Sequence, residues 1–172
     1  MKRAAGREAT LQWTEAVFDG DVRLRLAASA SGIRTIEFDT AGAAAGAVAG
    51  TENRGNALLA EAVRQLRAYF AGELRDFVLP LDMRGTDFQI RVYRQLLTIP
   101  YGETRSYAEI ARVIGAEKAV RAVGAANGAN PLAIVVPCHR VIGSSGKLTG
   151  YGGGLPLKQR LLELERGGLF RR

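Results

Sequence analysis

Two capping boxes in the second half of the chain fix where two helices begin. Thr86 is followed three residues later by Gln89, and Ser106 is followed at the same spacing by Glu109. In such a box the hydroxyl of the first residue and the side chain of the last each accept a hydrogen bond from a backbone amide that would otherwise lack a partner. We therefore expect one helix to start after each hydroxyl residue, and the first of them to run to about Thr98.

A further short helix follows the second capped one after a glycine turn. Gly115 ends the helix that runs through Ile114, and a helix over about 118–126 comes next, ended by Asn127-Gly128. This order predicts a helix-turn-helix, in which the second helix enters a DNA groove. Small residues surround Arg121 there, which suits close approach to DNA better than base-specific reading. An ordinary helical hairpin is the alternative that the pattern leaves open.

The first part of the chain has the alternation of strands. Three runs, 13–18, 22–28 and 33–38, are separated by turn residues at Asp19-Gly20-Asp21 and Ser31-Gly32. In the second run, apolar residues alternate with arginines, as expected for a strand with one buried face. The three runs predict an antiparallel meander.

A helix follows these strands. Asn56 is a good N-cap for a helix over Ala57–Phe70, and Gly72 ends it. Its apolar residues recur at helical spacing, so we expect it to cover the sheet. The stretch 41–50 contains only Ala, Gly and Val and is interpreted as a loop, and 74–81 as a connecting segment.

Two domains are predicted from this order of elements. Residues 1–80 form a sheet-plus-helix scaffold, and 81–172 form a mostly helical domain, so the fold class is α/β in the α+β sense. Residues 1–80 carry ten Lys or Arg and ten Asp or Glu, whereas 81–172 carry the entire net charge of +7. A basic half suggests a polyanionic partner, with charge that serves only solubility as the alternative.

Composition excludes several other classes of protein. No run approaches the roughly eighteen apolar residues of a membrane span, and the N-terminus lacks the apolar core of a secretory signal. One cysteine and one histidine leave neither an internal disulfide nor a Cys/His metal cluster, so we expect no metal and no cofactor. A free thiol is compatible with a cytoplasmic, reducing location.

The only cysteine and the only histidine, Cys138 and His139, are neighbours in the apolar stretch 134–142. A thiol is a strong nucleophile only as thiolate, and a pKa of about 8.5 leaves a few per cent ionised at neutral pH. The preceding Pro137 and the uniqueness of both residues favour a reactive thiol over a structural one. Because neighbours on an extended segment point to opposite faces, we expect no direct contact between the two side chains.

The chain then continues into a glycine-rich loop and a last helix. The loop, 143–154, lacks the lysine-serine or lysine-threonine pair of a nucleotide-binding loop, so it is interpreted as backbone that lies close to a ligand or DNA. Pro156 suits the start of the helix, and Glu165 falls in its final turn. A carboxylate there opposes the helix dipole, so Glu165 either has a partner or is simply exposed.

The segment Pro137-Cys138-His139-Arg140-Val141-Ile142 resembles the active-site motif of the O6-alkylguanine-DNA alkyltransferases, or methylated-DNA–protein-cysteine methyltransferases. The resemblance extends over about 85–165, through 99–104, Ser106-Tyr107, 119–124, Asn130-Pro131, Gly152-Gly153 and 161–165. It implies a ribonuclease H-like N-terminal domain, a winged helix-turn-helix-like C-terminal domain and a single-turnover repair of alkylated guanine.

The resemblance also implies roles for individual side chains. Cys138 would accept the alkyl group, His139 would act on the thiol through a water, and Glu165 would hold the other imidazole nitrogen. Asn130 would order the turn that carries the cysteine. Tyr107 would help to rotate the target nucleotide and lend a proton to the guanine.

DNA and guanine contacts are implied in the same way. Arg121 would fill the place of the flipped base, and the other DNA-binding residues would be Ser106, Tyr107, Ala119, Ala122, Gly124 and Ala125. The guanine pocket would be bordered by Pro137, Val141, Tyr151 and Gly152. The implied partner is duplex DNA that contains O6-alkylguanine, with O4-alkylthymine as a further substrate. The chain would act as a monomer, with cooperative binding along DNA left open.

Two other functions remain as alternatives. Non-catalytic alkyltransferase-like proteins bind the lesion but lack the cysteine, which is present here as Cys138. Cysteine hydrolases usually have their cysteine and histidine far apart in sequence, and they need no helix-turn-helix. Both alternatives therefore fit the sequence less well than single-turnover transfer.

Overall fold

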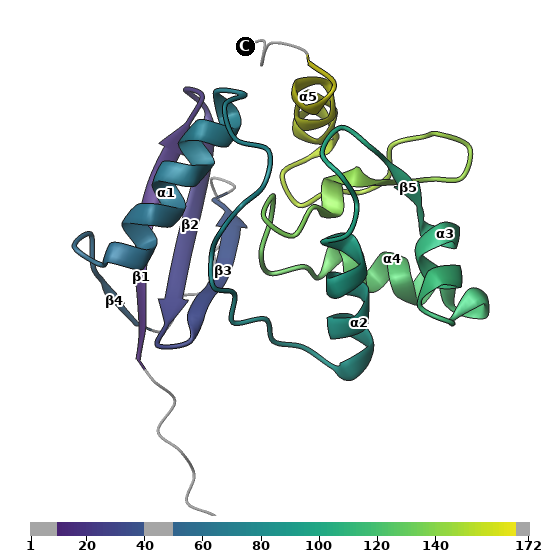
Figure 1. Ribbon diagram of the computed structural model, residues 1–172, viewed down its shortest axis with the longest axis horizontal. Helices are drawn as coiled ribbons and strands as arrows, with labels where there is room; N and C mark the ends of the chain where they lie inside the picture. The colour runs from purple at the N-terminus through teal and green to yellow at the C-terminus, as the bar shows by residue number, and fades with distance from the viewer. Residues whose placement is uncertain (1–9, 40–49, 168–172) are drawn as a thin grey trace, which may run out of the picture.

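The computed structural model describes residues 10–39 and 50–167 of the chain. They form a sheet lobe and a mostly helical lobe, and a linking segment crosses between the two (Figure 1). The predicted loop at 41–50 lies outside the described residues except for Gly50, which begins a strand.

Four strands make up the sheet. The predicted meander is confirmed: β1 (Leu11–Phe18), β2 (Val22–Ser29) and β3 (Gly32–Phe38) are antiparallel neighbours. A fourth strand, β4 (Gly50–Glu52), pairs in parallel with β1, so the order is β3-β2-β1-β4. The sheet is therefore mixed and not purely antiparallel as expected. All three residues of β4 are exposed, so no apolar alternation marks it.

One helix, α1 (Ala57–Phe70), lies along the face of the sheet, as predicted (Figure 1). The side chain of Asn56 accepts a hydrogen bond from the amide of Leu59 and so caps the helix. Leu66 and Tyr69, on the inner face of α1, are fully buried. Phe70 of the same helix stacks on Phe18 of β1. The buried face of α1 thus points Tyr69 toward the interior of the protein.

Between residues 81 and 167 the helical lobe contains four helices and two short 3-10 turns. No helix in the described ranges is long and apolar enough to cross a bilayer. Two short parallel strands, β5 (Arg105–Ser106) and β6 (Val141–Ile142), pair within this lobe. The helices are α2 (Asp87–Leu96), α3 (Tyr107–Val113), α4 (Val120–Gly128) and α5 (Leu155–Glu165), and the 3-10 turns are η1 (Glu117–Ala119) and η2 (Cys138–Arg140).

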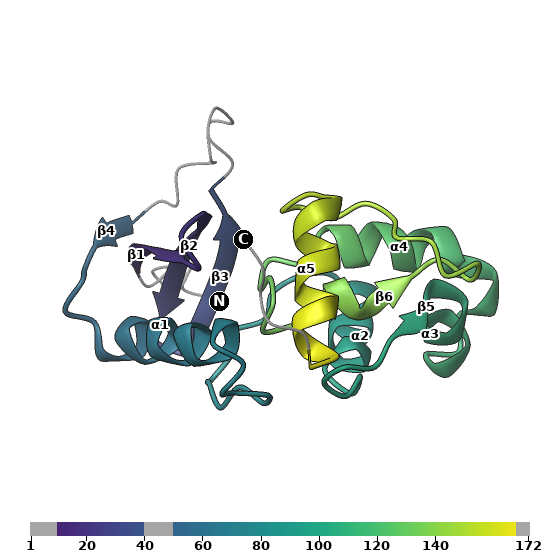
Figure 2. The ribbon, with the colours of Figure 1, turned by 90° about the horizontal axis from the view of Figure 1, so that it is seen from above.

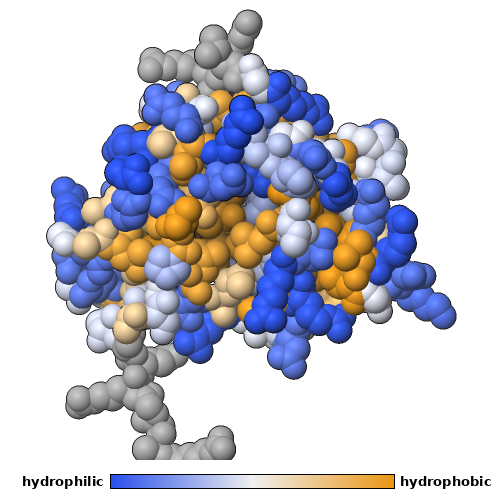
Figure 3. Space-filling view, in the orientation of Figure 1, coloured by the Kyte–Doolittle hydropathy of each residue, from blue (hydrophilic) through white to orange (hydrophobic). Residues whose placement is uncertain are grey.

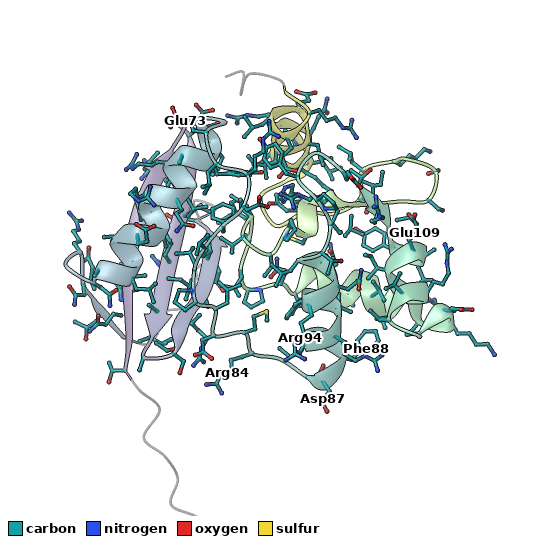
Figure 4. The ribbon with its side chains drawn as sticks, in the orientation of Figure 1. Glu73, Arg84, Asp87, Phe88, Arg94 and Glu109 are labelled. Atoms are coloured by element: carbon teal, nitrogen blue, oxygen red, sulfur yellow. The ribbon has the colours of Figure 1, made fainter. Side chains whose placement is uncertain are left out.

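Both predicted capping boxes are formed. The hydroxyl of Thr86 accepts from the amide of Gln89, whose side chain accepts from the amide of Thr86, at the start of α2. Ser106 and Glu109 do the same at the start of α3, where Figure 4 shows Glu109. The capping boxes therefore predicted the starts of both helices correctly. The end of α2, at Leu96, comes two residues before the expected Thr98.

The free edge of β3 binds two segments from outside the sheet. Ile33 pairs with the linking segment at 80–82. Ile36 donates to the carbonyl of Pro131 at 2.8 Å and accepts from the amide of Ala133 at 3.0 Å. The sheet lobe therefore holds, by backbone hydrogen bonds, the segment that leads into the Cys-His motif.

The two lobes meet at a second place as well. Figure 2 shows α5 on the side of the helical lobe that is nearest the sheet lobe. Hydrophobic atoms gather near the middle of the face seen in Figure 3, and Val78 of the linking segment is 81% exposed.

Candidate functional site

Cys138 lies in the 3-10 turn η2, within a stretch whose residues 132–141 are all buried. The amide of Cys138 donates to the carbonyl of Val136, and the amide of Arg140 donates to the carbonyl of Pro137, which closes the turn. The expectation of an extended segment is therefore wrong, because Pro137 and these hydrogen bonds bend the chain. The side chains of Cys138 and His139 still make no direct hydrogen bond among those of the described residues.

Two asparagines hold this turn in place. Asn130 donates to the carbonyl of Val136 at 2.8 Å and accepts from the amide of Leu132 at 3.0 Å. Asn127 donates to the carbonyl of Cys138 at 3.4 Å. Ile134, between the backbone partners Leu132 and Val136 of Asn130, has a φ of 70°, a left-handed conformation that is rare for a β-branched residue. Such strain costs about 1–3 kcal/mol and persists only where the surroundings enforce it, as these hydrogen bonds do.

His139 and Glu165 form a buried pair. Nε2 of the imidazole lies 2.7 Å from Oε1 of the carboxylate, and both side chains have no exposed surface. Because an ionised carboxylate can only accept, Nε2 carries the proton of the neutral imidazole. Nδ1 of His139 is then an acceptor, and it has no hydrogen-bond partner among residues 10–39 and 50–167. The pair thus presents a free basic nitrogen in the interior.

Glu165 accepts hydrogen bonds from four residues. Its Oε1 accepts from His139, from the hydroxyl of Tyr69 at 2.6 Å and from Nη2 of Arg140 at 3.0 Å. Its Oε2 accepts from Nε of Arg140 at 2.8 Å and from the amide of Gly102 at 3.1 Å. Burial raises the pKa of Glu165, but the hydrogen bonds that it accepts from His139 and Arg140, together with the charge of Arg140, outweigh this and hold the pKa below its usual range. The carboxylate is therefore ionised at neutral pH.

Gly102 has to be glycine for this contact to form. Its φ is 79°, and a Cβ there would lie 2.8 Å from the carbonyl oxygen of Glu165. The glycine in the Pro100-Tyr101-Gly102 turn therefore lets the backbone reach the end of α5.

The thiol and the imidazole are both neutral at rest. Burial raises the pKa of Cys138, and a hydrogen bond from Asn130 and the charge of Lys158 offset this only in part. Burial lowers the pKa of His139 by more than its hydrogen bond to Glu165 raises it. A thiolate therefore forms only when the thiol proton has a route to the imidazole.

A cavity of about 170 Å³ opens beside the thiol. It is smaller than the roughly 300–1,000 Å³ of pockets for drug-sized ligands, so it suits one small ring system. Tyr151, one of its lining residues, has a buried hydroxyl with no hydrogen-bond partner in the part of the chain that the structure describes, which costs about 1–3 kcal/mol unless a ligand supplies one. The lining residues are Ile36, Glu37, Phe38, Asn127, Gly128, Asn130, Ala133, Cys138, Gly150, Tyr151 and Gly152.

This lining agrees in part with the expected guanine pocket. Tyr151 and Gly152 line the cavity, whereas Pro137 and Val141 are buried outside its lining. The carbonyl of Val141 accepts instead from the buried ammonium of Lys158 at 2.6 Å.

The residues expected to contact DNA lie on or beside α4. They lie away from Cys138, His139 and Glu165, which together we call the relay. Arg121, Ala122 and Ala125 are exposed on α4, and Ala119 and Gly124 are half-buried. Tyr107 bonds to Thr149 at 2.8 Å and lies beside Gly124, where a Cβ would be 3.9 Å from its ring. The hydroxyl of Ser106 serves as the cap of α3. No hydrogen bond among the described residues links this group to Cys138, His139 or Glu165.

Residues of the site that could not be recognised from the sequence include Tyr69, Arg140, Lys158 and Asn127. A tyrosine or lysine on the apolar face of a helix is a signal that its polar atom has a buried partner. Tyr69 and Lys158 both stand at such positions, in α1 and α5.

No group of three or more possible metal ligands occurs in the ranges described.

Family models match both lobes. The model described as 6-O-methylguanine DNA methyltransferase, DNA binding domain, matches residues 87–167. The model described as 6-O-methylguanine DNA methyltransferase, ribonuclease-like domain, matches residues 23–83. Together the two matches cover most of the described chain.

Curated relatives give the same family. The methylated-DNA–protein-cysteine methyltransferase of Mycobacterium tuberculosis is 72% identical over 105 residues, which are 61% of this chain. The match spans 64% of that relative's length, just under two thirds. The constitutive enzyme of that name from Bacillus subtilis is 55% identical over 120 residues, 69% of this chain and 73% of the relative.

Solved structures match over nearly the whole chain. Mycobacterium tuberculosis OGT in complex with DNA superimposes with a TM-score of 0.79 at 51% identity, covering 92% of this chain and 94% of that one. The O6-methylguanine-DNA methyltransferase of Pyrococcus kodakaraensis shares the fold, with a TM-score of 0.55 at 22% identity over 91% of this chain and 99% of that one.

Proposed function

The chain belongs to the 6-O-methylguanine DNA methyltransferase family, and we propose that it repairs DNA directly by moving the alkyl group of O6-alkylguanine onto Cys138. The observation that carries the proposal is the buried thiol at the cavity beside a neutral imidazole with a free Nδ1. A thiol, a base and a carboxylate that orients the base are the elements of an activated nucleophile.

The transfer conserves protons and electron pairs. The thiol proton passes through a water to Nδ1 of His139, and Glu165 stabilises the imidazolium through Nε2. The thiolate attacks the alkyl carbon as the bond from that carbon to guanine O6 breaks. The oxygen keeps the electron pair, Tyr107 lends the guanine a proton, and the proton that His139 took from the thiol returns through solvent to Tyr107. A thioether remains on Cys138, and the chain has no second thiol to release it, so each molecule acts once.

Duplex DNA is the proposed partner. The alkylated oxygen lies inside the base stack, so the nucleotide has to be extruded at a cost of a few kcal/mol. Arg121, exposed on α4, is proposed to fill the vacant place, and the basic second half of the chain to bind phosphates. The small residues of α4 allow close approach without reading sequence, which suits repair in any context. A relative crystallised with DNA supports this interface.

The finer features extend this proposal. O4-alkylthymine is a second substrate, the chain acts as a monomer, and it works in the cytoplasm, where a free thiol stays reduced. The competing function is lesion binding without alkyl transfer. The presence of Cys138 as a free thiol argues against this alternative.

The proposed function predicts a stoichiometric reaction. A duplex with one O6-methylguanine is mixed with limiting protein, and the DNA is digested and its bases are quantified. We expect the guanine restored to equal the protein added and then to stop, and Cys138→Ser to restore none. Continued turnover, or repair by the variant, would contradict the proposal.

A further inference from the structure

Tyr69 belongs to α1 of the sheet lobe, yet its hydroxyl reaches the buried pair of the helical lobe. The residue is fully buried. Its hydroxyl donates to Oε1 of Glu165 at 2.6 Å and lies 3.4 Å from Nε2 of His139. Within the described ranges, it is the one side chain of the sheet lobe that hydrogen-bonds to Cys138, His139 or Glu165.

Aromatic neighbours fix the direction of this hydroxyl. The ring of Tyr69 packs against Phe70 of the same helix, with centroids 5.6 Å apart. It also packs against Phe77 of the linking segment at 5.4 Å and Tyr101 of the helical lobe at 6.2 Å. Close packing on three sides within the core disfavours any other rotamer of this ring. The hydroxyl is therefore committed to Glu165.

The hydroxyl of Tyr69 and Nε2 of His139 both donate to the same oxygen, Oε1 of Glu165. Burial and the charge of Glu165 raise the pKa of Tyr69 well above its ordinary value, so the hydroxyl keeps its proton and always donates. Donation limits where Oε1 can lie. It also draws charge away from the imidazole that shares this oxygen, since hydrogen bonds to a carboxylate compensate its negative charge.

We propose that Tyr69 is a positioning residue for alkyl transfer: it holds Oε1 of Glu165 against Nε2 of His139, so that Nδ1 keeps its lone pair for the proton of Cys138. The kinetic part of this inference rests on the proposed function. Because Tyr69 comes from α1, the relay is complete only when the sheet lobe is docked. The N-terminal half thus contributes to the reaction itself.

The test compares Tyr69→Phe with Tyr93→Phe. Tyr93 is also buried, and its hydroxyl donates to the carbonyl of Ala129 at 3.1 Å. Burial, and then the charge of a Cys138 thiolate, raise the pKa of Tyr93, so its hydroxyl stays neutral, and it makes no hydrogen bond to Cys138, His139 or Glu165 among the described residues. Each variant loses one hydroxyl and keeps its ring. With free O6-benzylguanine as substrate, we expect Tyr69→Phe to lower the transfer rate constant about tenfold, as is typical for lost outer-shell partners. Tyr93→Phe should stay near the rate of the unaltered protein, and both should bind duplex DNA normally.

A second readout is independent of alkyl transfer. His139 is the only histidine, so its imidazole signals in NMR spectra need no assignment by mutation. Without the hydroxyl, more charge on Oε1 faces Nε2, and His139 should titrate at higher pH in Tyr69→Phe but not in Tyr93→Phe. The other charged or titratable groups that act on or lie beside this imidazole are Glu165, Arg140, Lys158, Cys138 and Tyr151, and both variants leave them in place.

The outcomes separate the two proposals. An unchanged rate and an unchanged histidine titration in Tyr69→Phe would overturn the role of Tyr69. So would a rate loss that accompanies only a stability loss shared with Tyr93→Phe, with the titration unchanged. If the unaltered protein transfers no alkyl group, the proposed function fails, while the histidine titration still decides whether Tyr69 positions the pair.

Discussion

Nε2 of His139 lies 2.7 Å from Oε1 of Glu165, and both side chains are completely buried. The carboxylate fixes the tautomer, so the basic nitrogen of the imidazole is Nδ1. It also prepares the site for the positive charge that appears when the thiol proton arrives. The histidine next to the cysteine therefore depends on a residue from the far end of α5.

Removing the charge of Glu165 should nearly abolish transfer. In Glu165→Gln the amide can no longer stabilise an imidazolium, so we expect the rate constant with free O6-benzylguanine to fall at least about 100-fold. Arg140 also loses its buried partner, which should cost about 3–5 kcal/mol of unfolding free energy. Glu163→Gln, an exposed position on the same helix, is the matched control and should change neither value. An active Glu165→Gln would show that the charge is not needed.

Arg121 should matter for duplex DNA alone. Without the side chain that fills the vacancy, a flipped nucleotide returns to the stack more readily. We expect Arg121→Ala to slow repair of an O6-methylguanine duplex by at least about tenfold and to leave the reaction with free O6-benzylguanine unchanged. Arg112→Ala, which removes an exposed arginine of α3, controls for lost charge. Equal slowing on both substrates would place Arg121 in the chemistry and not in flipping.

Phe38 should limit the size of the adduct. It lines the cavity from β3, and its ring packs against Tyr151 with centroids 5.4 Å apart. Phe38→Ala opens this wall, so we expect the rate ratio of O6-benzyl to O6-methyl substrates to rise about fivefold, which is ~1 kcal/mol and the low end of what pocket contacts usually contribute. The ratio comes from single-turnover rates on matched duplexes. An unchanged or lower ratio would mean that Phe38 does not face the adduct.

Stability should fall as the pH is lowered from 7 to 5. The histidine of the unfolded chain has a pKa of about 6.5, and burial lowers the pKa of His139 in the folded protein. Between these values the unfolded chain binds more protons, so the free energy of unfolding decreases on acidification, by at most about 1.4 kcal/mol per pH unit for one group. The contribution is present above about pH 6.5 and is lost as the pH falls toward the folded pKa.

Urea unfolding at pH 5, 6 and 7 measures this dependence. His139→Gln should flatten the curve in this window, because carboxylates with ordinary or lowered pKa values titrate at lower pH. A free energy of unfolding that rises on acidification would contradict a neutral buried imidazole.

Local signals in the sequence predict local structure well. The capping boxes at Thr86 and Ser106 and the cap at Asn56 each depend on residues within one helical turn, and all three are formed. β4 could not be predicted, because its three exposed residues carry no apolar alternation and pair with β1, which is distant in sequence. The 3-10 turn at Cys138 was missed because it depends on hydrogen bonds from Asn127 and Asn130.

The site itself was predictable only where a motif carries it. Cys138 and His139 are marked by their uniqueness, and Glu165 by the family resemblance. Tyr69 contacts Glu165 across ninety-six positions of sequence, and only the docking of the two lobes brings them together. No local pattern encodes such a contact, although a tyrosine on a buried helix face indicates that a polar partner exists.

The most direct test of the central claim is the mass of the peptide that contains Cys138. The protein is incubated with excess O6-methylguanine duplex, digested with trypsin and measured by mass spectrometry. We predict that this peptide gains one methyl group in every active molecule, that no other peptide changes, and that further incubation adds nothing. Methylation at another residue, or repair of the duplex while Cys138 stays unmodified, would contradict the account.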